Sequence, residues 1–523
     1  MSCPPVSPTS LSIGWVNVKE INSGSTPTCA LGNGTGDDAP AINQCIVDAT
    51  VPGGSGVVYL PPGQYQILTP IVVNKPCTII GLTRGGGGRP KGSIPTAPVT
   101  ILLGSLDMNG IEISSNDVAL RDFAVYYAGA SLPQTPGVGI SVTDSQRVLL
   151  DNLSLDNIAN GVLVDGSSDV IMKRCRYAPL NGFGAGAVYG FKMTNDEGQG
   201  AKRCRLLFCR ADERDNSNGN AAIAFWITKG YSDVSLFACG ALSTAEGVRV
   251  ESDGGGVPTD VRVTLHTNDH AMTGFNLIDG GTVTISSSIT GTADNGSLVV
   301  ASTYSSGPIT VVGAHFSATK GVSVSGAKAV SLAGCAFDGN TSGDDALALT
   351  ASSAQVSITG CVFRGAGETS SIHIQASFAG NLACCGVVGV GGGGAGATTV
   401  GLQVDASSAD FALQGCSFEN YATAGVQDNG TNANRKIADV IGYNPRGVVP
   451  SPSVPPSGQF VTNATGVDCL VYVYGGTVTG ILISGSGSAN STGLTGGAVR
   501  LPAGEQIAIN YGVVAPQWIW FDE

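Results

Sequence analysis

The strongest constraint on the fold is an eight-residue pattern that recurs along most of the chain. Its positions read apolar, any, apolar, any, any, small or cysteine, any, apolar, as in Val118–Val125. The shortest spacings between copies are about 21–22 residues, the length of one solenoid coil. The repeat therefore predicts that each copy packs on the copy before it. Clear copies begin at Val118, Val148, Val170, Cys204, Val234, Ile309, Val330, Val356 and Phe411, and weaker copies begin near Val261 and Val283.

A second, shorter strand is predicted before many of these copies. It starts with glycine and continues with side chains that alternate between inward and outward positions. We therefore expect two strands per coil and a third side made of turns, which defines an all-β chain folded as a parallel β-helix. The short strands begin at Gly139, Gly161, Gly190, Gly247, Gly274 and Gly321.

Six of the 14 cysteines fall on the same position of the repeat. A small, soft side chain at an inward position suits a coil with little internal room. We therefore predict a ladder of buried free thiols rather than disulfides or metal ligands, and expect no metal and no cofactor. His266 takes the same position in a weak copy and is expected to face the core. The ladder comprises Cys175, Cys209, Cys239, Cys335, Cys361 and Cys416.

Composition excludes several classes of protein. The chain has 76 glycines, 12% charged residues and a formal charge of −13. Disordered chains have many charges and low hydrophobicity, which is the reverse of this composition. The negative charge argues against a nucleic-acid or anionic-membrane partner. We find no apolar stretch of transmembrane length and no Sec-type signal sequence at Met1, so we expect no membrane partner and no Sec-dependent secretion.

The N-terminal segment predicts a cap for the open end of a solenoid. Asp37-Asp38-Ala39-Pro40 marks a helix start, and Ala41, Ile42, Cys45, Ile46 and Ala49 form an apolar stripe at helical spacing. A strand, a turn and a second strand follow at Val57–Tyr65. This run, GTGDDAPAINQCI followed by GGSGVVYLPPGQYQI, resembles the N-terminal segment of the pectate-lyase superfamily. The resemblance implies a right-handed, single-stranded parallel β-helix with an α-helical cap.

The C-terminal part changes character near residue 440. Prolines between residues 445 and 456 predict a stiff linker, and alternating strands beyond it predict a small β-sandwich. This module resembles the C-terminal modules of phage fibres and spikes, which implies a homotrimer. The predicted domains are an N-terminal tail at 1–15, the cap at 16–75, the β-helix at 76–440, the linker at 441–457 and the sandwich at 458–523.

The candidate site is predicted where the repeat is interrupted. Insertions at 178–203 and 211–222 lie between Val170 and Val234, and insertions in a solenoid form loops on one face. Outward strand positions nearby carry Lys192, Trp226, Arg249 and Asn276. Farther along the chain, Asp344 and Asp345 stand in a turn between regular coils and are expected to be solvated. We name the candidate catalytic acids as Asp196, Glu197, Asp212, Glu213 and Asp215, and the candidate substrate-binding residues as Lys192, Trp226, Arg249, Asp253 and Tyr231.

These residue types suit a glycan. Aromatic faces pack on sugar C–H groups, and acids and arginine bind hydroxyl groups or carboxylates. Hydrolysis needs two carboxyl groups roughly 5–9.5 Å apart, which neighbouring coils can provide. A lyase would instead need a base such as Lys192, Lys202 or Arg249.

The resemblance to spikes implies a bacteriophage tailspike that folds in the host cytoplasm and is carried on the virion tail. We expect it to bind and depolymerise a bacterial surface polysaccharide by acid-base hydrolysis. Other tail or baseplate proteins are expected to hold it through residues 1–15. Two alternatives stay open, which are a non-enzymatic fibre or adhesin on the same scaffold and a polysaccharide lyase.

Overall fold

The structure is a computed structural model in which two compact units, residues 1–319 and 320–523, are distinguished by their contacts. The described residues are 14–20, 29–82, 98–105, 107–127, 136–179, 188–196, 202–212, 222–291, 293, 295–317, 321–338, 344–350, 355–365, 369–392, 398–406, 410–430, 435–442, 448–485 and 489–522.

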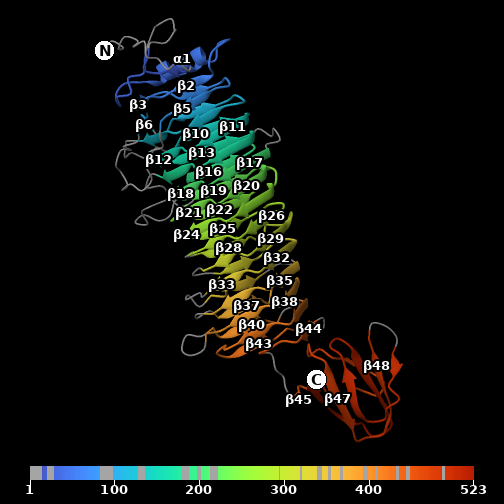
Figure 1. Ribbon diagram of the computed structural model, residues 1–523. Helices are drawn as coiled ribbons and strands as arrows, with labels where there is room; N and C mark the ends of the chain where they lie inside the picture. The colour runs from blue at the N-terminus through green and yellow to red at the C-terminus, as the bar shows by residue number, and fades with distance from the viewer. Residues whose placement is uncertain are drawn as a thin grey trace. The chain divides into compact units, whose positions relative to one another are not determined.

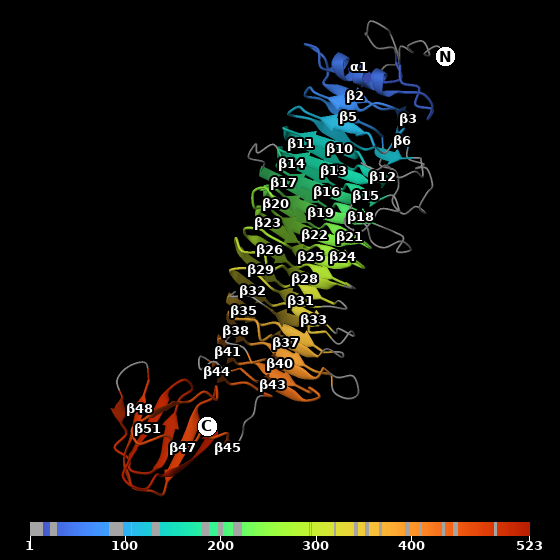
Figure 2. The ribbon, with the colours of Figure 1, turned by 180° about the vertical axis from the view of Figure 1, so that it is seen from behind.

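The first unit is a right-handed parallel β-helix in which the chain visits three sheets in turn (Figures 1 and 2). Sheet 1 holds β1 (Val16–Asn17), β2 (Val57–Tyr59), β5 (Thr78–Ile80), β8 (Ala119–Arg121), β11 (Gln146–Asp151), β14 (Ser168–Lys173), β17 (Lys202–Leu207), β20 (Ser232–Phe237), β23 (Thr259–Thr264), β26 (Val283–Ser286) and β29 (Pro308–Val312). Sheet 2 holds β3 (Gly63–Ile67), β6 (Val99–Leu103), β9 (Ala124–Tyr127), β12 (Ser154–Ile158), β15 (Arg176–Pro179), β18 (Arg210–Asp212), β21 (Gly240–Leu242), β24 (Thr267–Asp269), β27 (Ile289–Thr290) and β30 (His315–Phe316). Sheet 3 holds β4 (Ile71–Val73), β7 (Ile111–Ile113), β10 (Val138–Thr143), β13 (Asn160–Asp165), β16 (Val188–Thr194), β19 (Ala222–Thr228), β22 (Glu246–Glu251), β25 (Thr273–Leu277) and β28 (Gly296–Val300).

The second unit contains strands of the same three-sheet repeat. Its sheet 1 strands are β32 (Ala329–Ala333), β35 (Gln355–Thr359), β38 (Asn381–Cys385), β41 (Asp410–Gln414) and β44 (Arg435–Ala438). Its sheet 2 strands are β33 (Ala336–Asp338), β36 (Val362–Arg364), β39 (Val388–Val390) and β42 (Ser417–Glu419). Its sheet 3 strands are β31 (Val322–Val324), β34 (Leu347–Leu349), β37 (Ser370–Ile374), β40 (Val400–Val404) and β43 (Ala424–Asp428).

Each coil has three strands, so the expectation of two strands and a third side of turns is wrong. The eight-residue pattern covers two strands rather than one, because its fifth residue is a corner in the left-handed region. Asp122, Asn152 and Gly313 hold this corner with φ of 63°, 57° and 62°. Glycine, asparagine and aspartate reach this region easily, whereas other residues are destabilised there by roughly 1–2 kcal/mol. The chain nevertheless places Phe208 and Leu265 at the same corner, with φ of 57° and 53°.

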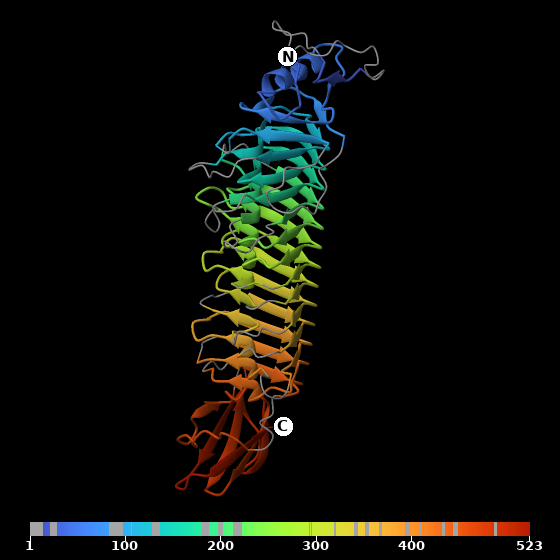
Figure 3. The same ribbon diagram turned by 90° about the vertical axis from the view of Figure 1, so that its left-hand side faces the viewer.

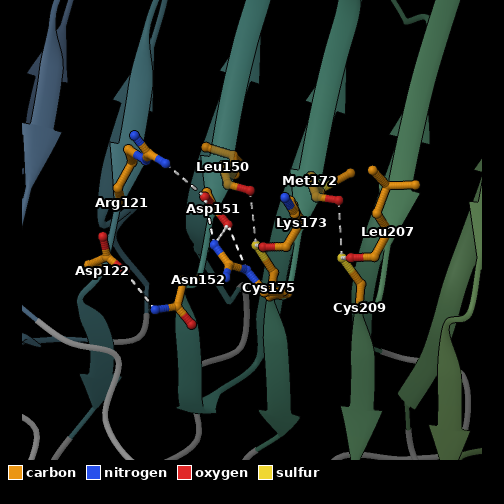
Figure 4. A network of polar contacts seen from close by, with 11 residues as sticks. Arg121, Asp122, Leu150, Asp151, Asn152, Met172, Lys173, Cys175, Leu207 and Cys209 are labelled. Carbon is orange, nitrogen blue, oxygen red and sulfur yellow. Dashed lines mark hydrogen bonds and ion pairs between the residues drawn. The ribbon is translucent and has the colours of Figure 1, made fainter.

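The predicted cysteine ladder is confirmed. All six thiols are free and buried at the sixth position of the pattern. Cys175 and Cys209 each donate a hydrogen bond to a carbonyl oxygen one coil back, at Leu150 (3.3 Å) and Met172 (3.4 Å) (Figure 4). His266 is also fully buried there, as expected, and its Nε2 lies 2.9 Å from Oδ1 of Asn268. Outside the ladder, Cys29 is disulfide-bonded.

The N-terminal cap is present as helix α1 (Ala39–Ala49), which lies at the N-terminal end of the β-helix (Figure 3). The predicted apolar stripe of this helix is buried. Asn43 ties the helix to the first coil, since its amide donates to the Pro70 carbonyl and its Oδ1 accepts from the Val72 amide. The Asp38 side chain does not cap the helix as expected but accepts hydrogen bonds from the Leu31 and Gly32 amides. Within the described residues, no helix has the length and apolar character to cross a membrane.

The C-terminal strands form two antiparallel four-stranded sheets that share one apolar core. The sequence predicted most of these strands. It missed the strand Val448–Val449, which lies in the expected linker and pairs with Trp520 and Phe521, and it also missed the strands Phe460–Thr462 and Asn490–Ser491. One sheet has the order β45 (Val448–Val449), β52 (Gln517–Asp522), β47 (Cys469–Tyr474) and β50 (Gly497–Leu501), and the other has the order β46 (Phe460–Thr462), β51 (Gln506–Tyr511), β48 (Val478–Ser484) and β49 (Asn490–Ser491).

The packing of the thiol ladder generates a first prediction. Cys361 has no exposed surface, so Cys361→Leu adds volume to a filled core and should lower the free energy of unfolding by about 1–3 kcal/mol. Cys361→Ser should lower the free energy of unfolding by less than about 1 kcal/mol, because Ser288 already takes this position in another coil. Denaturant unfolding measures both changes. Equal stability of the leucine variant and the unmodified protein would contradict the inward assignment.

Candidate functional site

A column of polar side chains runs along the outward surface of sheet 3 in the first unit. Lys192 on β16 pairs with Trp226 on β19, which pairs in turn with Arg249 on β22 and then Asn276 on β25. The residues on either side of each column member in its strand are buried, as strand alternation requires. The predicted outward column is therefore confirmed, and it places two cations on the coils next to one indole ring.

Trp226 is held between these cations. The Lys192 Nζ lies 3.9 Å from a centroid of the Trp226 ring system, and the Arg249 guanidinium carbon lies 5.4 Å from it. Tyr189 on β16 approaches the indole edge-on at 6.1 Å. Burial lowers the pKa of Lys192, an effect that the negative charge of Asp196 opposes. The Trp226 ring thus contacts two cations. The sequence had suggested a different role, in which the face of this ring packs on a sugar.

Arg249 also bridges two glutamates that sequence reasoning missed. Its Nη1 lies 3.4 Å from Oε1 of Glu246, and its Nη2 lies 2.9 Å from Oε2 of Glu251. All three residues belong to β22, where Arg249 and Glu251 share the outward face by strand alternation. That alternation is a signal in the sequence for the pair of Arg249 and Glu251, whereas the insertions pointed to acids elsewhere in the chain. One guanidinium that touches both carboxylates keeps them close together.

The two glutamates differ in their environment. Burial raises the pKa of Glu246, and the nearby Arg249 and Asn276 reduce this effect without cancelling it. The Glu246 side chain is 15% exposed and that of Glu251 is 9% exposed. Among the described residues, Oε2 of Glu246 is a buried atom with no hydrogen-bond partner. A buried carboxyl group of this kind holds its proton to a higher pH than an exposed one does.

Asp196 lies beside this column, as predicted. It forms an ion pair with Lys229, which raises the pKa of that lysine through a hydrogen bond. Its backbone amide donates to Oδ1 of Asp165 at 2.8 Å. Asp253 is exposed in the turn after β22. Asp196 and Lys229 therefore add charged groups at the ends of β16 and β19.

The remaining predicted site residues do not join this column. Asp212 lies on β18 of sheet 2, is 5% exposed, and contacts Arg176 at 3.4 Å. Tyr231 has no exposed surface and its hydroxyl donates to the Ser167 carbonyl. The expectation that Tyr231 contacts a substrate is therefore corrected, because a fully buried ring cannot touch a sugar. The predicted acids Glu197, Glu213 and Asp215 lie outside the described residues.

A second polar cluster lies on sheet 3 of the second unit. The Nδ1 atom of His373 lies 2.6 Å from Oδ2 of Asp345, and its Nε2 lies 3.1 Å from Oδ2 of Asp405. A neutral imidazole donates from only one nitrogen, so carboxylates at both nitrogens favour the imidazolium form. The hydrogen bond with Asp345 raises the pKa of His373, and Asp405 adds to the effect. The cluster joins three consecutive coils, through β34, β37 and β40.

This cluster corrects the expectation that Asp345 is solvated. The Asp345 side chain is 13% exposed and also accepts a hydrogen bond from Ser370 at 2.7 Å, whereas Asp344 is exposed. The sequence did not reveal the contact because Asp345, His373 and Asp405 meet only once three coils have stacked. Within the described part of the chain, no three histidine, cysteine, aspartate or glutamate residues are arranged to hold a metal ion.

The comparisons with known proteins agree with this architecture. Residues 15–87 match the family model described as rhamnogalacturonase A/epimerase, pectate lyase-like. The chain as described has a right-handed parallel β-helix fold. No curated protein sequence matches the chain.

Solved phage proteins share the fold at low identity. The pre-mature gene product 12 of bacteriophage phi29 has a TM-score of 0.59 at 14% identity, over 82% of this chain and 59% of that one. The tailspike of the E. coli bacteriophage HK620, solved as a mutant in complex with a hexasaccharide, has a TM-score of 0.54 at 8% identity, over 98% and 93%. The Dettilon tailspike has a TM-score of 0.51 at 10% identity, over 97% and 94%.

The His373 cluster generates a prediction on pH. The folded pKa of His373 is above the unfolded value of about 6.5. The stabilisation by its ion pairs is therefore complete below that pH and is lost as pH rises through the folded pKa. We expect the thermal unfolding midpoint to fall as pH is raised from about 6 to about 9, and this fall should be smaller in His373→Gln.

Asp405→Asn provides the matched test of this prediction. Removing one carboxylate lowers the pKa of His373, so the loss of stability should begin at a lower pH than in the unmodified protein. Identical pH profiles for the unmodified protein and the His373→Gln variant would show that His373 does not contribute.

Proposed function

We propose that this chain is a bacteriophage tailspike that binds a bacterial surface polysaccharide and hydrolyses it with a pair of carboxyl groups. The support is the β-helix fold that it shares with phage tailspikes, one of which was solved with a bound hexasaccharide. A polysaccharide is long, and the outward column on sheet 3 offers charged and aromatic side chains on successive coils. The polysaccharide would be a capsule, an O-antigen or an exopolysaccharide.

The observation that carries the proposal is the bridge from Arg249 to Glu246 and Glu251. Because one guanidinium contacts both carboxyl groups, their separation is compatible with the roughly 5–9.5 Å that glycoside hydrolysis requires. Glu246, with its raised pKa, is the proposed general acid that protonates the leaving oxygen. Glu251 is the proposed second carboxyl group of the pair, which acts as base or nucleophile.

The cations beside Trp226 are the proposed substrate-binding groups. Lys192 and Arg249 donate hydrogen bonds and carry positive charge, so they suit sugar hydroxyl groups and carboxylates. Asp196 and Asp253 lie nearby as hydrogen-bond acceptors. The acids predicted first, Asp196, Glu197, Asp212, Glu213 and Asp215, stay in the proposal as a rival catalytic set that experiment can separate from Glu246.

The proposed assembly is a homotrimer on the virion tail. The N-terminal residues 1–15 would contact other tail or baseplate proteins, and the chain would fold in the host cytoplasm. The C-terminal antiparallel sheets would serve assembly or receptor contact.

The proposed general acid generates a third prediction. Glu246→Gln should lower the rate of polysaccharide cleavage by about 100-fold or more and leave binding largely intact. Cleavage by the unmodified protein should decline as pH rises through the folded pKa of Glu246, because the acid must be protonated. Reducing-end release from host polysaccharide measures both effects. Glu112→Gln is the control, since Glu112 lies on the same sheet, between the coils of β4 and β10.

The rival set of acids gives a fourth prediction. Alanine at Asp196, Glu197, Asp212, Glu213 and Asp215 together should reduce reducing-end release less than Glu246→Gln does. If the five-fold variant is inactive and Glu246→Gln keeps full activity, the catalytic pair belongs to this set of five acids instead of β22. Binding without any shortening of the glycan would support the adhesin, and an unsaturated product would support the lyase.

A further inference from the structure

One corner of the first unit carries an aromatic residue at a position that several other coils fill with asparagine, serine or glycine, and that two others fill with Arg174 and Leu265. Phe208 takes the left-handed conformation at the fifth position of the repeat, with φ of 57°. The same position holds Asn152 two coils before it, Ser287 three coils after it, and glycine in later coils, including Gly313 and Gly334. The left-handed corner is a feature of the repeat, and what distinguishes Phe208 is the aromatic ring that it places there.

This aromatic residue also exposes an apolar surface. The Phe208 side chain is 54% exposed and meets Phe237 edge-to-face, with ring centroids 5.9 Å apart. Phe237 lies on β20 of the next coil and is itself 36% exposed. Two neighbouring aromatic rings at a solvent-exposed corner are therefore available to a ligand.

A groove opens beside these rings on sheet 2. Its volume is about 310 Å³, at the small end of the roughly 300–1,000 Å³ typical of ligand pockets. Phe208 forms one side, and Arg210, Thr267 and Asp269 supply polar groups. The Arg210 side chain is 57% exposed and the Asp269 side chain is 50% exposed. Oδ1 of Asp269 lies 2.9 Å from Nδ1 of His270. The groove thus combines an aromatic wall with a cation, a carboxylate and a hydroxyl group.

We infer that this groove is a second glycan-binding site, which holds one pyranose ring of the polysaccharide. The C–H face of the sugar packs on Phe208, while Arg210, Thr267 and Asp269 bind its hydroxyl groups. The site lies at the corner between sheets 1 and 2, whereas Trp226 lies on sheet 3, so the two sites are separate. The inference rests on the proposed function in that the ligand is the same polysaccharide.

Two sites on one protein change how a long polymer binds. Once the polymer occupies one site, binding at the second becomes intramolecular and raises the overall affinity. Loss of the Phe208 groove should therefore weaken binding of the polymer even when the Trp226 column is intact. It should have little effect on cleavage of a short fragment that fills only the column.

The test uses Phe208→Asn, because asparagine already takes this corner at position 152. Leu265→Asn is the matched control, since Leu265 has the same conformation and is 49% exposed but does not line the groove. The probes are purified capsule and O-antigen polysaccharides of candidate hosts, immobilised for binding. We expect Phe208→Asn to weaken binding at least about ten-fold, Leu265→Asn to change it less than about two-fold, and thermal unfolding to show that both fold.

Arg210→Ala gives a second measurement that leaves the corner backbone unchanged, and it should weaken binding in the same direction. Unchanged binding in both Phe208→Asn and Arg210→Ala would overturn this inference and leave the proposed function standing. A fall in molecular mass in light scattering for both Phe208→Asn and Leu265→Asn would overturn it in favour of a contact between copies of the chain. Failure of the unmodified protein to bind any of the polysaccharides would overturn the proposed function, and this inference with it.

Discussion

The structure depends on the hydrogen-bond register between successive coils. Parallel strands pair residue by residue, so a side chain that faces inward in one coil stacks on an inward side chain in the next. Phe191 and Phe225 show the result, since they pair in register and their rings stack with centroids 5.3 Å apart. The same register aligns the outward side chains. The candidate site is therefore a consequence of core packing, because Lys192, Trp226 and Arg249 could not meet if a strand slipped by one residue.

The repeat in the sequence was sufficient to predict both kinds of column. The inward thiols and the outward Lys192–Trp226–Arg249 series follow from strand alternation and a constant offset between coils. The third strand of each coil was missed because strands such as Arg210–Asp212 are only three residues long and show little alternation. Tyr231 was misplaced because Lys229 and Gly230, both in the left-handed region, turn the chain so that the ring enters the core.

Contacts that span several coils were beyond prediction from one sequence. Asp345, His373 and Asp405 come from three different coils, and no local pattern links them. Glu246 and Glu251 are close in sequence to Arg249, yet their distinct environments arise from burial against neighbouring strands. In both clusters one cationic side chain contacts two carboxylates. In the His373 cluster the three residues are brought together by the stacking of three coils, whereas in the Arg249 cluster they lie along the single strand β22.

The inward thiol ladder has a consequence for chemical durability. A thiol reacts with oxidants as its thiolate, and burial raises the pKa of ladder residues such as Cys209 and Cys416. These sulfur atoms are also shielded from dissolved reagents by the strands around them. The coil interior should therefore keep the same covalent state in reducing and oxidising surroundings. Among the free cysteines in the described residues, Cys385 alone is exposed, which makes it the expected point of oxidative damage during long storage in air.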